Sequence, residues 1–129
     1  MFFRILLSLT LLYPLLGEAG WIDIKTSTDS LVQVEEDWVE RSKTSGTLWK
    51  IQSYEHPVRI GKISYRSVKT RTEYDCLGQR YRNRSQVYFG EPRAEGKILS
   101  SAAFTSPWEP FLAEDPVAQW ACQHLKESP

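Results

Sequence analysis

Few side chains in this 129-residue sequence could carry covalent or metal chemistry. Its two histidines, His56 and His124, lack the close pairing on one helix that is typical of metal ligands. Ser53 lies close to Glu55 and His56, but neighbours within one strand do not form a catalytic triad. The sequence therefore predicts a protein that is not an enzyme and needs no cofactor or metal.

Positive side chains are concentrated in two predicted strands, residues 64–76 and 79–90. If Asp75 pairs with Arg80 and Glu73 with Arg82, five cations share one face and only these two carboxylates oppose them. The predicted stripe consists of Lys69, Arg71, Arg80, Arg82 and Arg84. It would bind an acidic partner, such as a sulfated glycan, a lipopolysaccharide phosphate or an acidic protein loop. The alternatives are a solvated face and a face covered by carboxylates of another element.

The same register makes further predictions about the hairpin. Tyr74 would face Tyr81, Val68 would face Val87, and Arg71 and Arg84 would be neighbours of like charge. The loop would be either Leu77-Gly78 or residues 76–79. Between the tyrosines and valines, the inner face carries small polar residues, which suit a polar pocket, a dimer seam or exposure to solvent. These residues are Thr70, Thr72, Asn83 and Ser85.

The sequence has two cysteines, Cys76 and Cys122. An even pair in an exported chain indicates a disulfide, although two free thiols remain the alternative. Asp115-Pro116 is typical of a helix start, with Asp as the N-cap and Pro at the first helical position. Apolar residues then recur so that Cys122 would face the sheet and meet Cys76.

The N-terminus predicts export. Arg4 precedes an apolar stretch from Ile5 to Leu16, and Gly17-Glu18-Ala19 offers small residues for signal peptidase. We expect residues 1–19 to be a cleaved signal peptide, since the apolar run is too short for a retained membrane anchor. No later segment is apolar enough to span a membrane. No cysteine lies near the cut, so we expect no lipid anchor.

The remaining pattern indicates an α+β fold in one domain, residues 20–129. About six antiparallel strands are expected, with a C-terminal helix tied to the sheet by the disulfide. The predicted strands are 21–25, 31–34, 47–54, 64–76, 79–90 and 97–104, and His56-Pro57 should end the third. The tryptophans are expected in the core, except for Trp108 between two prolines. Sixteen basic and sixteen acidic residues balance, which argues against binding nucleic acid.

Several landmarks, in their order along the chain, resemble the surface-adhesin protein E family of Gram-negative bacteria. They are Trp21, Trp49, Tyr74-Asp75-Cys76, Tyr88-Phe89-Gly90, the segment 106–110 (Ser-Pro-Trp-Glu-Pro) and Cys122. The resemblance covers nearly all of residues 20–129. It implies an antiparallel sheet with a helix, and a disulfide between the matching cysteines. The family's founding member is an adhesin that binds host matrix and serum proteins and can dimerise.

We therefore expect a non-catalytic bacterial envelope domain that binds host or extracellular-matrix proteins. Its partner would be a protein or an acidic glycan, and a homodimer is left open. The alternative is a periplasmic accessory protein that binds an envelope component. The expected location is outside the cytoplasm, in the periplasm, at the cell surface or secreted.

Overall fold

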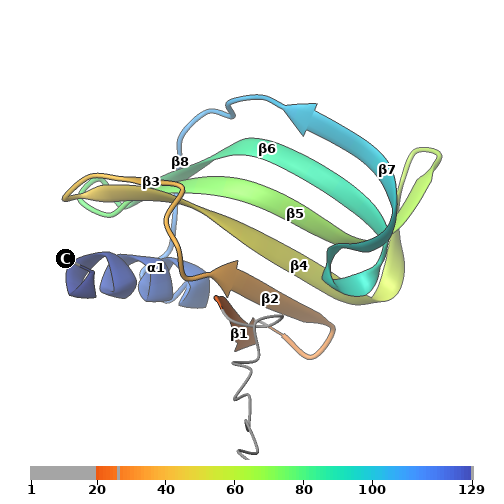
Figure 1. Ribbon diagram of the computed structural model, residues 1–129, viewed down its shortest axis with the longest axis horizontal. Helices are drawn as coiled ribbons and strands as arrows, with labels where there is room; N and C mark the ends of the chain where they lie inside the picture. The colour runs from red at the N-terminus through yellow and green to blue at the C-terminus, as the bar shows by residue number, and fades with distance from the viewer. Residues whose placement is uncertain (1–19, 26, 129) are drawn as a thin grey trace, which may run out of the picture.

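The computed structural model describes residues 20–25 and 27–128. The predicted signal peptide, residues 1–19, lies outside the described residues. The described chain forms one antiparallel sheet and one α-helix, as predicted (Figure 1). The strands are β1 (Trp21–Lys25), β2 (Ser30–Glu35), β3 (Glu40–Arg41), β4 (Ser45–Ile60), β5 (Ile63–Asp75), β6 (Arg80–Glu91), β7 (Glu95–Ala103) and β8 (Glu109–Pro110). The helices are the single-turn η1 (Pro92–Ala94) and α1 (Pro116–Glu127).

The six longer strands run in the order β1-β2-β4-β5-β6-β7, and their places match the six predicted strands. The short strands β3 and β8 were not predicted, and they pair with β4 and β6. Figure 1 shows a strongly curved sheet, with α1 along one end and the turn from η1 into β7 at the other. No helix among the described residues is long and apolar enough to cross a membrane.

The core lies between α1 and the face of the sheet that we call the inner face. Alternation places Ile22 opposite Val34, and Ile24 opposite Val32, on this face. Leu48 and Tyr74 continue the face on β4 and β5, at 0% and 2% exposed. The helix contributes the predicted apolar residues Val117, Ala118, Ala121 and Leu125, all buried.

One feature caps the start of α1 and another ties the helix to the sheet, and the sequence predicted both. The Asp115 carboxylate accepts hydrogen bonds from the backbone amides of Val117 (2.9 Å) and Ala118 (3.2 Å), as an N-cap residue should. Cys76, just after β5, forms a disulfide with Cys122 in the helix, with 5.7 Å between their Cα atoms. The alternative of two free thiols is therefore wrong.

Strand β4 corrects one prediction, because it continues past His56-Pro57 to Ile60. The register with β5 shifts between Ser53 and Val58, so Pro57 sits in a bulge where its missing amide breaks no ladder. Arg66 on β5 fills this bulge: its guanidinium donates to the carbonyls of Tyr54 (3.2 Å) and Glu55 (2.8 Å). A side chain on the next strand thus satisfies carbonyls that the bulge leaves out of the ladder.

The β5–β6 hairpin confirms the predicted register at its tip and corrects it further along. The pairs from Asp75–Arg80 to Thr72–Asn83 form as expected, around a four-residue loop. A bulge then adds Arg84 as an extra residue of β6, so Arg71 faces Ser85 and Val68 faces Tyr88. The predicted Val68–Val87 and Arg71–Arg84 pairs are therefore wrong.

The bulge also changes the polar strip predicted for the inner face. Gln86 replaces Ser85 opposite Thr70, and Ser85 moves to the other face. Thr70 and Thr72 are 6% and 0% exposed, so the expectation that this stretch meets solvent is wrong. Thr72 is satisfied by a hydrogen bond to the side-chain oxygen of Asn83 (3.0 Å).

Candidate binding face

The two histidines lie apart from each other in the sequence and have different surroundings. His56 is exposed in the β4 bulge. His124 is stacked between Trp38 (5.4 Å between ring centroids) and Trp120 (4.6 Å), and its Nε2 lies 2.6 Å from the carbonyl oxygen of Glu36. Within the described part of the chain, no three His, Cys, Asp or Glu residues are grouped to hold a metal ion. This packing gives His124, a residue of α1, a structural role.

The five cations of the predicted stripe lie on the outer face, opposite the face that carries α1. Lys69 and Arg71 alternate with the inner residues of β5, and the β6 cations lie beside them across the hairpin. The Arg84 side chain joins this face at the bulge, where it reaches Glu73. The structure therefore brings all five predicted side chains onto one surface.

The end of the stripe near the hairpin tip is neutralised internally. Arg80 pairs with Asp75 at 2.8 Å, while Arg82 (2.8 Å) and Arg84 (3.0 Å) share the Glu73 carboxylate. Hydrogen bonds from the Gly78 backbone amide and then from Arg80 hold the pKa of the Asp75 carboxyl below its usual value. We call Arg80, Arg82 and Arg84 the paired end.

Trp108 packs against the paired end. It was predicted to be exposed, but its side chain is half-buried. The guanidinium carbons of Arg80 and Arg82 lie 4.3 and 4.2 Å from its ring centroid. Both distances are typical of cation–π contacts, which hold the planar guanidinium groups in place. The paired end is therefore a preorganised surface with little charge left to satisfy.

The other end of the stripe has cations without carboxylates. In residues 20–25 and 27–128, no Asp or Glu oxygen lies within 4.0 Å of the Lys69 or Arg71 nitrogens. The Lys69 ammonium instead lies 5.7 Å from the Trp21 ring centroid and 5.1 Å from that of Trp49, and Arg71 lies 5.8 Å from Trp49. We call Lys69 and Arg71, with Trp21 and Trp49, the unpaired end.

Two buried polar atoms at the unpaired end also lack partners. They are Nε of Arg71 and Oγ of Ser85, which are cross-strand neighbours at the bulge. A cavity of about 40 Å³ adjoins Arg71 and Arg84 and is lined also by Val39, Glu40 and Thr47. It has room for a water molecule, which would satisfy a donor that faces inward. Among the residues that the structure describes, no carboxylate forms an ion pair with the Arg71 guanidinium or the Lys69 ammonium.

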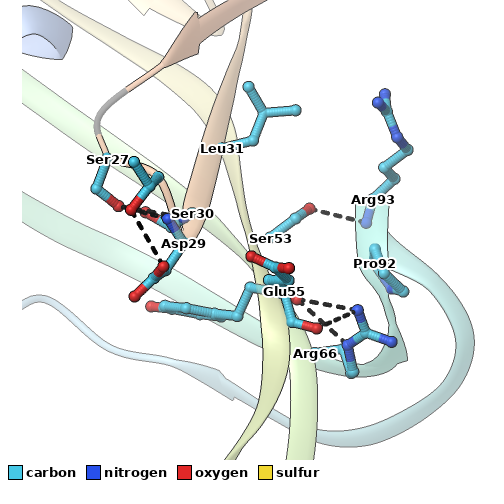
Figure 2. Close-up of a pocket in the computed structure, with 11 residues that line it drawn as sticks. Ser27, Asp29, Ser30, Leu31, Ser53, Glu55, Arg66, Pro92 and Arg93 are labelled. Atoms are coloured by element: carbon cyan, nitrogen blue, oxygen red, sulfur yellow. Dashed lines mark hydrogen bonds between the residues drawn. The ribbon is translucent and has the colours of Figure 1, made fainter.

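A second hollow, of about 300 Å³, lies near the opposite end of the sheet and was not predicted (Figure 2). The β1–β2 turn, the β4 bulge and η1 line it. Ser53 accepts a hydrogen bond from the Arg93 amide (2.9 Å) and Ser67 accepts one from the Ala94 amide (2.9 Å). These bonds hold Arg93 and Ala94 at φ values of 63° and 57°, which are uncommon for residues other than glycine. No motif in the sequence could have shown this hollow.

The tryptophans depart from the prediction that they lie in the core. Trp38 and Trp120 pack against it from the side of α1. Trp21, Trp49 and Trp108 lie on the outer face beneath cations. Sequence patterns missed this because each contact joins residues from different strands or from a distant loop.

Comparisons with known proteins agree with this architecture. A sequence model described as surface-adhesin protein E matches residues 21–123. A structure of Haemophilus influenzae protein E superimposes with a TM-score of 0.59 at 13% identity, over 86% of this chain and 89% of that one. A crystal structure of protein E from non-typeable Haemophilus influenzae gives 0.54 at 12%, over 81% and 74%. No curated protein sequence matches the chain.

Proposed function

The chain belongs to the surface-adhesin protein E family, and from this premise we propose that it is an exported envelope domain that binds an acidic partner through the unpaired end of its outer face. The partner class that the family suggests is a host or extracellular-matrix protein, with its acidic glycans included. The domain does this by binding alone, with no catalysis. Assembly into a homodimer is compatible with this role.

One observation carries the proposal: the stripe is satisfied at one end and unsatisfied at the other. Arg80, Arg82 and Arg84 already have carboxylates, so a ligand there would have to displace Asp75 or Glu73. Among the described residues, Lys69 and Arg71 have no carboxylate oxygen within 4.0 Å, and their cationic groups lie over indole rings. Partly desolvated cations of this kind gain most from an incoming carboxylate, sulfate or phosphate, because charge-assisted hydrogen bonds are strong where water is partly excluded.

The tryptophans support the same surface. Trp and Arg, with Tyr, are enriched at the energetic centres of protein interfaces. Trp21 and Trp49 are half-buried, so each presents part of its ring beside the cations. Such rings lose little conformational freedom on binding, which favours affinity.

Binding of the purified chain, without residues 1–19, to immobilised laminin and heparin tests the proposal. Surface plasmon resonance would compare the wild type with Lys69→Ala/Arg71→Ala at low and physiological salt. The matched control is Arg59→Ala/Lys62→Ala, which removes two exposed charges at the β4–β5 turn. We expect the stripe variant to bind at least about tenfold more weakly than the control, with wild-type binding reduced by salt. Equal binding by the two double variants, or no binding by a folded wild type, would refute the proposal.

A periplasmic accessory role is the second candidate, and one observation favours it. Both cysteines of the sequence are joined in the disulfide, so neither is available to carry a lipid near residue 19. Protease treatment of intact cells separates the two roles. A surface adhesin is digested under these conditions, whereas a periplasmic protein is protected until the outer membrane is opened.

A further inference from the structure

Strand β7 forms one edge of the sheet. It pairs with β6 on one side and is the last strand in the order β1-β2-β4-β5-β6-β7. Among the described residues, no strand pairs with its other side. Figure 1 shows this edge along the curved side of the molecule, away from α1.

The second half of β7 lacks the features that usually prevent strand addition. Native edge strands carry charges, prolines or bulges that block pairing with another chain. From Ile98 to Trp108 the sequence has no charged residue, and its single proline, Pro107, comes after the strand. The register irregularities lie at the other end, between Tyr88 and Glu91 of β6. Residues 100–103 pair with β6 one by one without a bulge.

The backbone of this segment offers hydrogen bonds outward. The amide of Phe104 donates to the Arg84 carbonyl on β6 at 3.1 Å. Because inward and outward amides alternate along an antiparallel strand, the amides of Ser101 and Ala103 point away from β6. Their carbonyls point the same way, so the edge presents two donors and two acceptors in the spacing of a strand.

The side chains of the edge indicate what would fit. Serines and alanines at 100–103 are small on both faces of the sheet, and they leave room for larger neighbours. Ile98 and Phe104 flank them, at 58% and 43% exposed. With no charge along the segment, an acidic or basic strand would gain nothing there and would lose its solvation.

We propose that the β7 edge binds an extended, uncharged peptide segment of a partner protein, which joins the sheet as a further strand. Main-chain hydrogen bonds supply affinity, and large side chains at alternate positions fill the space beside the small ones. A second copy of β7 fits less well, because it would place serines and alanines against serines and alanines. This site does not depend on the cationic stripe.

A phage-displayed library of random dodecapeptides, selected on the purified chain, tests the edge directly. Ser101→Pro removes an outward amide without touching the β6 ladder, and Ser101→Thr keeps the amide as a matched control. We expect selected peptides to share alternating large uncharged residues. They should bind Ser101→Thr as tightly as the wild type and bind Ser101→Pro about tenfold more weakly, with an unchanged melting temperature.

A second variant, Ser101→Lys, keeps the test valid if the proline variant misfolds. It leaves the backbone amide intact and places a charge at the edge. It should weaken the same peptides by a similar factor. Equal affinity for all three variants, or failure to select any peptide, would overturn the assignment. Dimers of the wild type that Ser101→Lys abolishes, without peptide binding, would instead make the edge a self-interface and overturn it too.

Discussion

The inner and outer faces of the sheet are made by alternate residues of the same strands, yet they are held in different ways. On the inner face, Leu48 and Val34 are 0% exposed beneath α1, whose first turn is capped by Asp115 and which a disulfide ties to the sheet. On the outer face, Lys69 and Arg71 lie over half-buried indole rings without a carboxylate partner among the described residues. The inner face therefore provides stability, and the outer face carries the charge that we propose a partner binds.

This division implies that stability and binding can be changed separately. Removing inner-face contacts should lower the free energy of unfolding without altering what the folded chain binds. Changing the unpaired end should do the reverse. The following variants test the separation, in order of decreasing effect on stability.

Loss of the disulfide should have the largest effect. Cys76 and Cys122 are 46 residues apart, and closing a loop of that length stabilises a fold by about 4 kcal/mol in the chain-entropy model. We expect Cys76→Ser/Cys122→Ser to unfold at a much lower temperature in calorimetry. The folded fraction should still bind heparin like the wild type. An unchanged melting temperature would show that α1 is held without the disulfide.

A cavity created beneath α1 should cause the second-largest loss of stability. Leu48→Ala empties a fully buried site in the core and should reduce the free energy of unfolding by about 3 kcal/mol. Lys69→Ala, on the outer face of β5, removes no inner-face contact, so it serves as the control and should lower the free energy of unfolding by under about 1 kcal/mol. Urea denaturation measures both. Similar losses in the two variants would contradict the division between the faces.

The helix cap should contribute less. Asp115→Ala leaves the Val117 and Ala118 amides without their acceptor and should destabilise the fold by about 1 kcal/mol. Asp115→Asn keeps a side-chain oxygen at the N-cap and should lose only part of this. If the two variants denature at the same urea concentration, the cap does not act through these hydrogen bonds.

Tyr81 should make stability depend on alkaline pH. Burial, and then the hydrogen bond to Glu109 (2.8 Å), raise its pKa from 10.0 to about 12. Because the folded pKa is the higher one, this contribution to stability is complete below pH 10 and is lost as pH rises towards 12. Absorbance at alkaline pH, as the difference between wild type and Tyr81→Phe, should show one phenol titrating near 12. A difference curve centred at 10 would contradict this.

The smallest change in the free energy of unfolding is expected for a variant of the outer face. Arg80→Ala removes an ion pair whose arginine side chain is 46% exposed, so it should alter the free energy of unfolding by less than about 1 kcal/mol. The pKa of Asp75 should rise yet stay below its ordinary value, because the Gly78 amide remains. Carbon-detected NMR titration of the carboxyl follows this pKa. A larger loss of stability would mean that the paired end is structural.

Sequence reasoning succeeded where two independent signals coincided. At the hairpin tip, opposite charges and paired tyrosines required the same register, and the structure has it. At α1, the N-cap and the apolar spacing both placed Cys122 towards the sheet. Each signal needs only neighbouring residues or a single pair of strands.

Sequence reasoning failed where a residue elsewhere in the fold overrode a pattern read from neighbouring residues. Pro57 should end a strand, but Arg66 takes over the carbonyls of the bulge and β4 continues. The β-bulge at Arg84 interrupts the alternation of inward and outward side chains along β6, and the residue pattern of the sequence gives no sign of this interruption. The indole–cation contacts were also out of reach, because they need β1, β4 and β5 to lie side by side.

The disulfide also determines how the chain responds to tension. If a bound domain were pulled from its two ends, the covalent link would carry the load past the segment between Cys76 and Cys122. The sequence separation of 46 corresponds to about 150 Å of contour length that reduction of the disulfide would free to extend. While the link is intact, β6, β7 and β8 are shielded from the applied force, whereas Lys69 and Arg71 lie in the part that bears it. Oxidation state thus sets the extensibility of the domain.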